Sequence, residues 1–148
     1  MKQSWMTLQE RQLIYCLRWW VGFFAAATVL FAAFPFDVIY WLNNIGHAIF
    51  RWPYKSLGLP NEHFWQILAV SLLATLTYIA AIAQSDIRQN LSYVKLIIVA
   101  KFVSSAGFLT ALVITGPYFV YLVGAVIDFL IFAITLFCYR RTVVSRGL

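Results

Sequence analysis

The chain has 148 residues, of which 63% are hydrophobic and only 11% are charged, and its formal net charge is +6. Soluble domains contain about 45–50% apolar and about 25% charged residues. A soluble fold of this length has too little interior to bury so much apolar surface, so the composition excludes one and predicts an all-α integral membrane protein. The basic residues are scattered over loops rather than gathered in a patch, so nucleic-acid binding is not predicted.

Four apolar segments are long enough to cross a bilayer, which requires about 20 residues at about 1.5 Å per residue. The first follows Thr7 and Glu10, whose spacing is typical of a helix-starting capping box. Gly116-Pro117 forces a tight reversal before the last segment. We expect residues 1–148 to form a single four-helix transmembrane domain. Its predicted spans are residues 13–34, 62–84, 93–115 and 118–139.

The connection between the first two spans, residues 37–52, has the pattern of an amphipathic helix. Its apolar residues recur at helical spacing: Val38, Trp41, Leu42, Ile45, Ala48 and Ile49. Its polar residues take the other side: Asn43, Asn44, His47 and Arg51. Such a segment is typical of an interfacial helix. We expect it to anchor the outer surface of the bundle, to form a lid over a site, or to offer a docking face to a partner.

Most lysines and arginines fall at one side of the predicted spans, whereas Arg51 and Lys55 fall at the other. The majority side holds Lys2, Arg11, Arg18, Arg88, Lys95, Arg140, Arg141 and Arg146. Because positive charge concentrates in cytoplasmic loops, both termini are expected to be cytoplasmic, in a bacterial inner membrane. The outline of four spans with a partly embedded segment after the first is similar to that of the DoxX-like small membrane proteins. That similarity implies the architecture, and no site residue is carried over from it.

A pair of charges lies deep inside the last two predicted spans, where an unpaired charge is costly and marks a candidate functional site. Asp128 is near the middle of the last span, and Lys101 is about two turns into the preceding one. Counting from the reversal, Asp128 lies opposite residues one turn from Lys101, a distance that a lysine side chain reaches. We therefore predict an intramembrane ion pair. The supporting polar stripe consists of Ser104, Ser105, Tyr121 and Thr135.

Three roles are open for this pair. It fixes the register of two helices, as some buried polar groups do, or it forms part of a proton or substrate path. Alternatively, it belongs to a site for a lipid headgroup, a quinone or a partner subunit.

All six tryptophans fall in the first 65 positions. Indole is favoured at membrane interfaces, so interfacial belts and packing within the bundle account for these residues. The alternative is a surface that contacts a lipid, a quinone or a neighbouring protein. The residues predicted for such a surface are Trp19, Trp20, Trp41, Trp52 and Trp65.

The sequence contains no nucleophile–base pair, phosphate loop, metal-ligand cluster or cofactor motif. Haem between spans needs histidines deep inside the spanning helices, whereas His47 and His63 both fall on the external side, close to the outer surface. Cys16 and Cys138 form no CxxC motif. We therefore predict no enzymatic activity, no bound metal and no cofactor, with a bound lipid or quinone as the candidate ligand.

The predicted function is that of a small non-catalytic subunit of a larger inner-membrane complex. Its expected partners are membrane lipids and other integral membrane subunits. The alternative is a small proton-coupled transporter or channel that acts as a homo-oligomer through Asp128 and Lys101.

Overall fold

The structure is a computed structural model that describes residues 6–53 and 63–146, with side chains of the second range described from residue 66 onward. Its helices are α1 (Leu8–Ala33), α2 (Pro35–Phe50), α3 (His63–Ser85), α4 (Leu91–Ile114) and α5 (Phe119–Ser145). The described ranges contain no strand. Four helices, α1, α3, α4 and α5, are long and apolar enough to cross a membrane. The predicted all-α membrane fold with four spans is confirmed, and α2 occupies the place of the predicted amphipathic segment.

The first and last helices of the chain, α1 and α5, are longer than the apolar segments from which they were predicted. The predicted capping box is formed: the Glu10 N–H donates to Thr7 Oγ1 at 3.2 Å, and the Thr7 N–H donates to Glu10 Oε2 at 2.8 Å. This cap starts α1 at Leu8. The last span was predicted to end at residue 139, but α5 continues to Ser145. The added turns are held because the Thr142 hydroxyl is fully buried and donates to the carbonyl of Gln9 at 3.3 Å.

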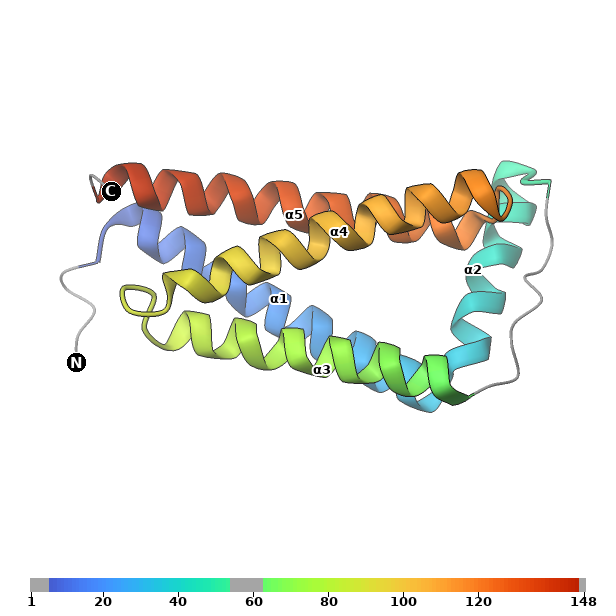
Figure 1. Cartoon of the computed structure of the whole chain (residues 1–148), viewed down its shortest axis with the longest axis horizontal. Helices are drawn as coiled ribbons and strands as arrows, with labels where there is room; N and C mark the ends of the chain where they lie inside the picture. The colour runs from blue at the N-terminus through green and yellow to red at the C-terminus, as the bar shows by residue number, and fades with distance from the viewer. Residues whose placement is uncertain (1–5, 54–62, 147–148) are drawn as a thin grey trace.

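The spanning helices form two pairs, α1 with α3 and α4 with α5 (Figure 1). The start of α1 and the end of α5 lie together at one end of the molecule, here called the terminal end. The pairs lie close there and diverge toward the opposite end. At that opposite end, here called the α2 end, α2 runs across the bundle axis from the end of α1 to the start of α5 (Figure 1).

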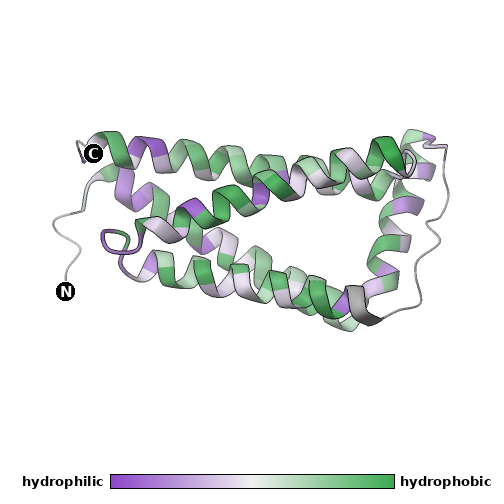
Figure 2. Cartoon of the chain, viewed as in Figure 1, coloured by the Kyte–Doolittle hydropathy of each residue, from purple (hydrophilic) through white to green (hydrophobic). Residues whose placement is uncertain are grey.

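The buried apolar core is concentrated in the half of the bundle nearer the terminal end. Its largest members are Phe24, Leu13 and Leu17 of α1, Ile87 of the turn before α4, and Ile97 of α4. The helices are largely apolar along their length (Figure 2), and many of their large apolar side chains are exposed. In an apolar 18-residue stretch of α3 only 11% of the residues are buried, and in such a stretch of α5 28% are buried. Exposed apolar surface on this scale is what lipid or another membrane helix covers.

α2 is fastened to α5 by one of the residues predicted for its polar side. Asn43 is fully buried, and its Oδ1 accepts the backbone N–H of Val120 at 3.2 Å. Gly46 packs against Phe119 so closely that a Cβ there would lie 2.2 Å from Phe119 Cγ. The apolar side chains Trp41 and Ile49 are exposed instead. The bundle-facing side of α2 therefore includes a polar residue, because the first turn of α5 has free N–H groups that need an acceptor.

Candidate functional site

A buried ion pair joins α4 and α5. Lys101 Nζ lies 2.7 Å from Asp128 Oδ1, and the two residues are 6% and 7% exposed. The ammonium also lies 4.9 Å from the centre of the Phe24 ring on α1, which is a cation–π contact. Three helices therefore meet at this pair, and the lysine charge is balanced by a carboxylate and an aromatic face.

Close packing of α4 on α5 near the pair depends on a glycine. A Cβ at Gly124 would lie 2.9 Å from the Phe108 ring of α4, so a larger residue would push the helices apart. One turn of α4 beyond Lys101, the Ser105 hydroxyl donates to the carbonyl of Ala125 at 3.0 Å. This bond between the helices holds the register that places Lys101 opposite Asp128.

The other members of the predicted polar stripe do not form one continuous path. Ser104 is half-buried. The Tyr121 ring packs near Phe108, with centroids 6.4 Å apart. Thr135 lies farther along α5, where its hydroxyl accepts the indole N–H of Trp20 at 2.9 Å. Within the described part of the chain, no buried side-chain nitrogen or oxygen lacks a hydrogen-bond partner. Of the residues predicted for this stripe, Ser105 and Thr135 make hydrogen bonds between helices.

A second buried charge, Glu10, lies at the terminal end and is only 2% exposed. Its Oε1 accepts Arg88 Nε at 3.3 Å, Arg146 Nε at 3.0 Å and Arg146 Nη2 at 2.8 Å. One carboxylate thereby links the start of α1, the turn after α3 and the end of α5. The sequence pattern predicts a role for Glu10 in the capping box alone. The concentration of basic residues on the same side of the membrane was the signal that could have suggested these pairs.

The proximity of two cysteines was not predicted from the sequence. The thiols of Cys16 on α1 and Cys138 on α5 lie side by side, next to Trp20 and Thr135. Both cysteines are free and half-buried. Among the described residues, no group of three or more Cys, His, Asp or Glu side chains is arranged to hold a metal.

The tryptophans predicted for a partner or lipid surface fall into two groups. Trp19 and Trp41 point outward and are 77% and 71% exposed. Trp20 and Trp52 join parts of the chain instead: Trp20 binds Thr135, and the Trp52 indole donates to the carbonyl of Pro117. The side chain of Trp65 lies outside the described residues.

Of the two histidines considered as ligands, the structure describes the side chain of His47 only. His47 Nδ1 lies 2.9 Å from the carbonyl oxygen of Trp52, which fixes the chain just after α2. The side chain of His63 lies outside the described residues.

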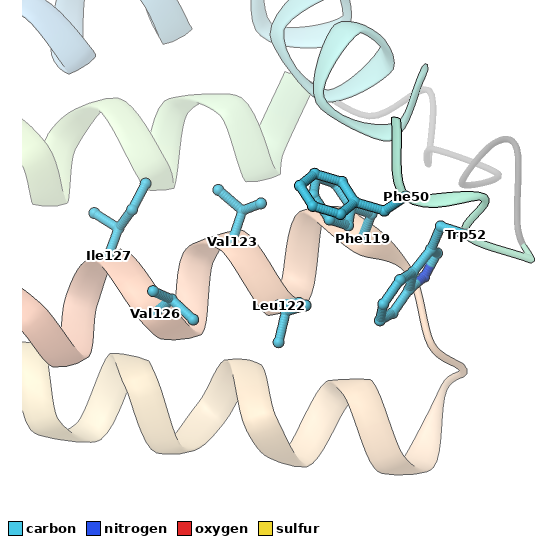
Figure 3. Close-up of a pocket in the computed structure, with 7 residues that line it drawn as sticks. All are labelled: Phe50, Trp52, Phe119, Leu122, Val123, Val126 and Ile127. Atoms are coloured by element: carbon cyan, nitrogen blue, oxygen red, sulfur yellow. The ribbon is translucent and has the colours of Figure 1, made fainter. Parts of the chain in front are cut away.

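A groove of about 470 Å³ lies between the end of α2 and one side of α5 (Figure 3). We call it the α2–α5 groove. Phe119 forms its end wall, stacked on Phe50 with centroids 5.4 Å apart and meeting Trp52 edge-on at 5.6 Å. Among the described residues, its lining contains no titratable side chain. The lining residues are Phe50, Trp52, Phe119, Leu122, Val123, Val126 and Ile127.

The site geometry thus consists of paired charges inside the bundle and an apolar groove on its side. The groove lining ends at Ile127, next in the chain to Asp128, but includes neither member of the ion pair. No protein-family model, curated protein or solved structure matches the chain.

Proposed function

We propose that this chain is a small non-catalytic subunit of a larger complex in a bacterial inner membrane. In this proposal, a neighbouring subunit packs into the α2–α5 groove. The observation that carries the proposal is the groove itself, which is apolar, open to the side and about 470 Å³ in volume. Bulky apolar side chains of a partner helix are the groups that such a lining accommodates, because they match its shape and require no polar partner.

The groove exists because α2 is held in a fixed position. Asn43 accepts a hydrogen bond from the first turn of α5, Gly46 packs against Phe119, and Trp52 bonds to Pro117. These contacts hold Phe50 and Trp52 over the α5 surface without a partner present. A preformed surface loses less conformational freedom on association, which favours binding.

The distribution of charge supports an orientation with both termini in the cytoplasm. Arg88, Arg140, Arg141 and Arg146 all belong to the terminal end, and positive charge is retained on the cytoplasmic side. In that orientation α2 lies at the outer leaflet, and the α2–α5 groove opens into the outer half of the membrane. The partner surface would then be a transmembrane segment rather than a cytoplasmic domain.

A structural role for the Lys101–Asp128 pair fits this function better than a transport role. The carboxylate is already neutralised by an ammonium 2.7 Å away, and both residues are buried. A carrier of protons must exchange with water, and neither residue lines the α2–α5 groove. The transporter alternative therefore has less support than the subunit proposal.

Extraction of native membranes with a mild detergent, followed by measurement of the native mass, tests the proposal. We expect the chain to migrate in an assembly much heavier than its own 17.0 kDa. A monomer or a small homo-oligomer would overturn the subunit proposal.

A matched pair of variants tests the groove. Val126→Trp fills the groove from a residue that is 49% exposed, whereas Val103→Trp adds the same bulk to an α4 residue that is 61% exposed outside it. We expect only Val126→Trp to release the chain from its assembly. Retention of both variants in the assembly would show that the groove is not the docking site.

A further inference from the structure

A second groove lies on the outer face of α1, also about 470 Å³ in volume, and it contains a charge. We call it the α1 groove, and its lining residues are Tyr15, Arg18, Trp19, Gly22 and Phe23. Trp19 is 77% exposed and Tyr15 is 60% exposed, so the groove opens outward. Gly22 forms the bottom of the α1 groove and leaves it open, because no neighbouring atom lies within 4 Å of the position that a Cβ would occupy there.

Arg18 lies about 15 Å along α1 from Leu8, at about 1.5 Å per residue, and therefore within an apolar span. Its side chain runs back toward the terminal end, since the guanidinium carbon lies 5.7 Å from the centre of the Tyr15 ring. Helical side chains tilt in this direction, and a long basic side chain in a span reaches its charge toward the headgroups. The backbone of Arg18 is thus in the hydrocarbon region while its charge lies near the membrane interface.

The charge of Arg18 has no counter-ion within the described residues. The salt bridges found there involve Glu10 and Asp128, and Arg18 takes part in none of them. Glu10 is on the same helix, but it is 2% exposed and is bound to Arg88 and Arg146. An exposed guanidinium among aromatic side chains at this depth is best balanced by an anion supplied from outside the chain.

We propose that the α1 groove binds one anionic phospholipid from the leaflet at the terminal end. The phosphate accepts hydrogen bonds from the Arg18 guanidinium, a planar donor that suits phosphate geometry. The Trp19 indole and the Tyr15 hydroxyl are further donors at the mouth of the groove. One acyl chain lies over Gly22 and beside Phe23.

The direction of the groove favours a phospholipid over an acidic side chain of a partner. From Arg18 the groove continues along α1 toward Gly22 and Phe23, away from the terminal end and into the hydrocarbon region. A phospholipid has its anion at the interface and its apolar chains along this same direction. Along α1, Arg18 therefore lies where the headgroup would lie, and Gly22 and Phe23 lie where the acyl chain would lie.

The test is native mass spectrometry of the full chain after reconstitution in phosphatidylcholine vesicles that contain phosphatidylglycerol. We expect the wild-type chain to retain one phosphatidylglycerol in preference to phosphatidylcholine. Arg18→Gln should lower that preference about fivefold, since one basic residue near a membrane surface contributes about that factor. Gly22→Leu keeps the charge but fills the bottom of the groove, and it should also lower retention of phosphatidylglycerol.

Arg141→Gln is the matched control, because Arg141 also lies over an aromatic ring, that of Phe137 at 5.1 Å, but does not line the α1 groove. We expect this variant to retain phosphatidylglycerol as the wild type does. An equal loss in both arginine variants would overturn the proposal, because it would reflect general surface charge. Unchanged retention of phosphatidylglycerol in either Arg18→Gln or Gly22→Leu would overturn it as well. Arg18→Gln removes the proposed headgroup contact, and Gly22→Leu fills the space proposed for the acyl chain.

Discussion

The side-chain oxygen of Asn43 accepts the backbone N–H of Val120 at 3.2 Å, across 77 positions of the chain. A residue of α2 thereby caps the first turn of α5, where the N-cap residue, Tyr118, makes no side-chain capping hydrogen bond. Together with the packing of Gly46 on Phe119 and the hydrogen bond from Trp52 to Pro117, this contact couples the position of α2 to that of α5. It therefore also fixes the shape of the α2–α5 groove.

Replacing Asn43 with alanine should destabilise the contact between α2 and α5. The Val120 N–H would lose its acceptor in a partly buried place, at a cost of about 1–2 kcal/mol. Denaturant titration in detergent, followed by tryptophan fluorescence, measures the free energy of unfolding. Asn44→Ala is the control, because Asn44 caps no described helix, and it should lower that free energy much less. Equal losses in the two variants would contradict the capping role.

Adding a methyl group at Gly46 should force α2 away from α5. The new Cβ would lie 2.2 Å from Phe119 Cγ, so Phe119 or the helix must move, at about 1–3 kcal/mol. Gly107→Ala provides the opposite expectation, because no atom lies within 4 Å of its Cβ position. That change should leave stability unchanged or raise it by about 0.5–1 kcal/mol, since alanine favours a helix. A comparison of thermal unfolding midpoints separates the two, and a tolerated Gly46→Ala would disprove the close packing.

Replacing one member of the Lys101–Asp128 pair should destabilise the bundle strongly, whereas replacing both members should destabilise it much less. Lys101→Met or Asp128→Asn leaves a buried charge without its partner, which costs about 3–5 kcal/mol. The double variant Lys101→Met/Asp128→Leu contains neither charge and should recover most of that loss. Titration with SDS, read as the loss of helical packing, measures all three. A double variant as unstable as the single variants would show that the pair itself stabilises the bundle.

The two arginines that bind Glu10 should contribute unequally to stability. The side chain of Arg146 is 14% exposed and that of Arg88 is 53% exposed, so water screens the Arg88 pair more strongly. Arg146→Gln should therefore lower the free energy of unfolding by about 1.5–3 kcal/mol, and Arg88→Gln by less than about 1 kcal/mol. Chemical denaturation of the two variants side by side checks this order. The reverse order would show that burial does not control the strength of these pairs.

The amino-acid sequence determined the four spans, the helix between the first two, and the start of α1. Each of these depends on local properties: a segment of about 20 apolar residues partitions into lipid whatever its neighbours are, and Thr7 and Glu10 cap the helix to which they belong. The contact between Lys101 and Asp128 could also be predicted from a short stretch of sequence. The short turn at Gly116 makes α4 and α5 antiparallel neighbours, so counting residues from the turn aligns the two side chains.

The tertiary structure alone decided which helices pair and which way each one faces. Glu10 meets Arg88 and Arg146 at separations of 78 and 136 positions, and no pattern within one helix encodes those contacts. The inward orientation of Asn43 likewise depends on the free N–H groups of α5. In lipid the apolar faces of a helix are nearly equivalent in energy, so hydropathy places a helix in the membrane but does not fix its rotation. Close packing and buried hydrogen bonds supply that difference, and they exist only once the helices have assembled.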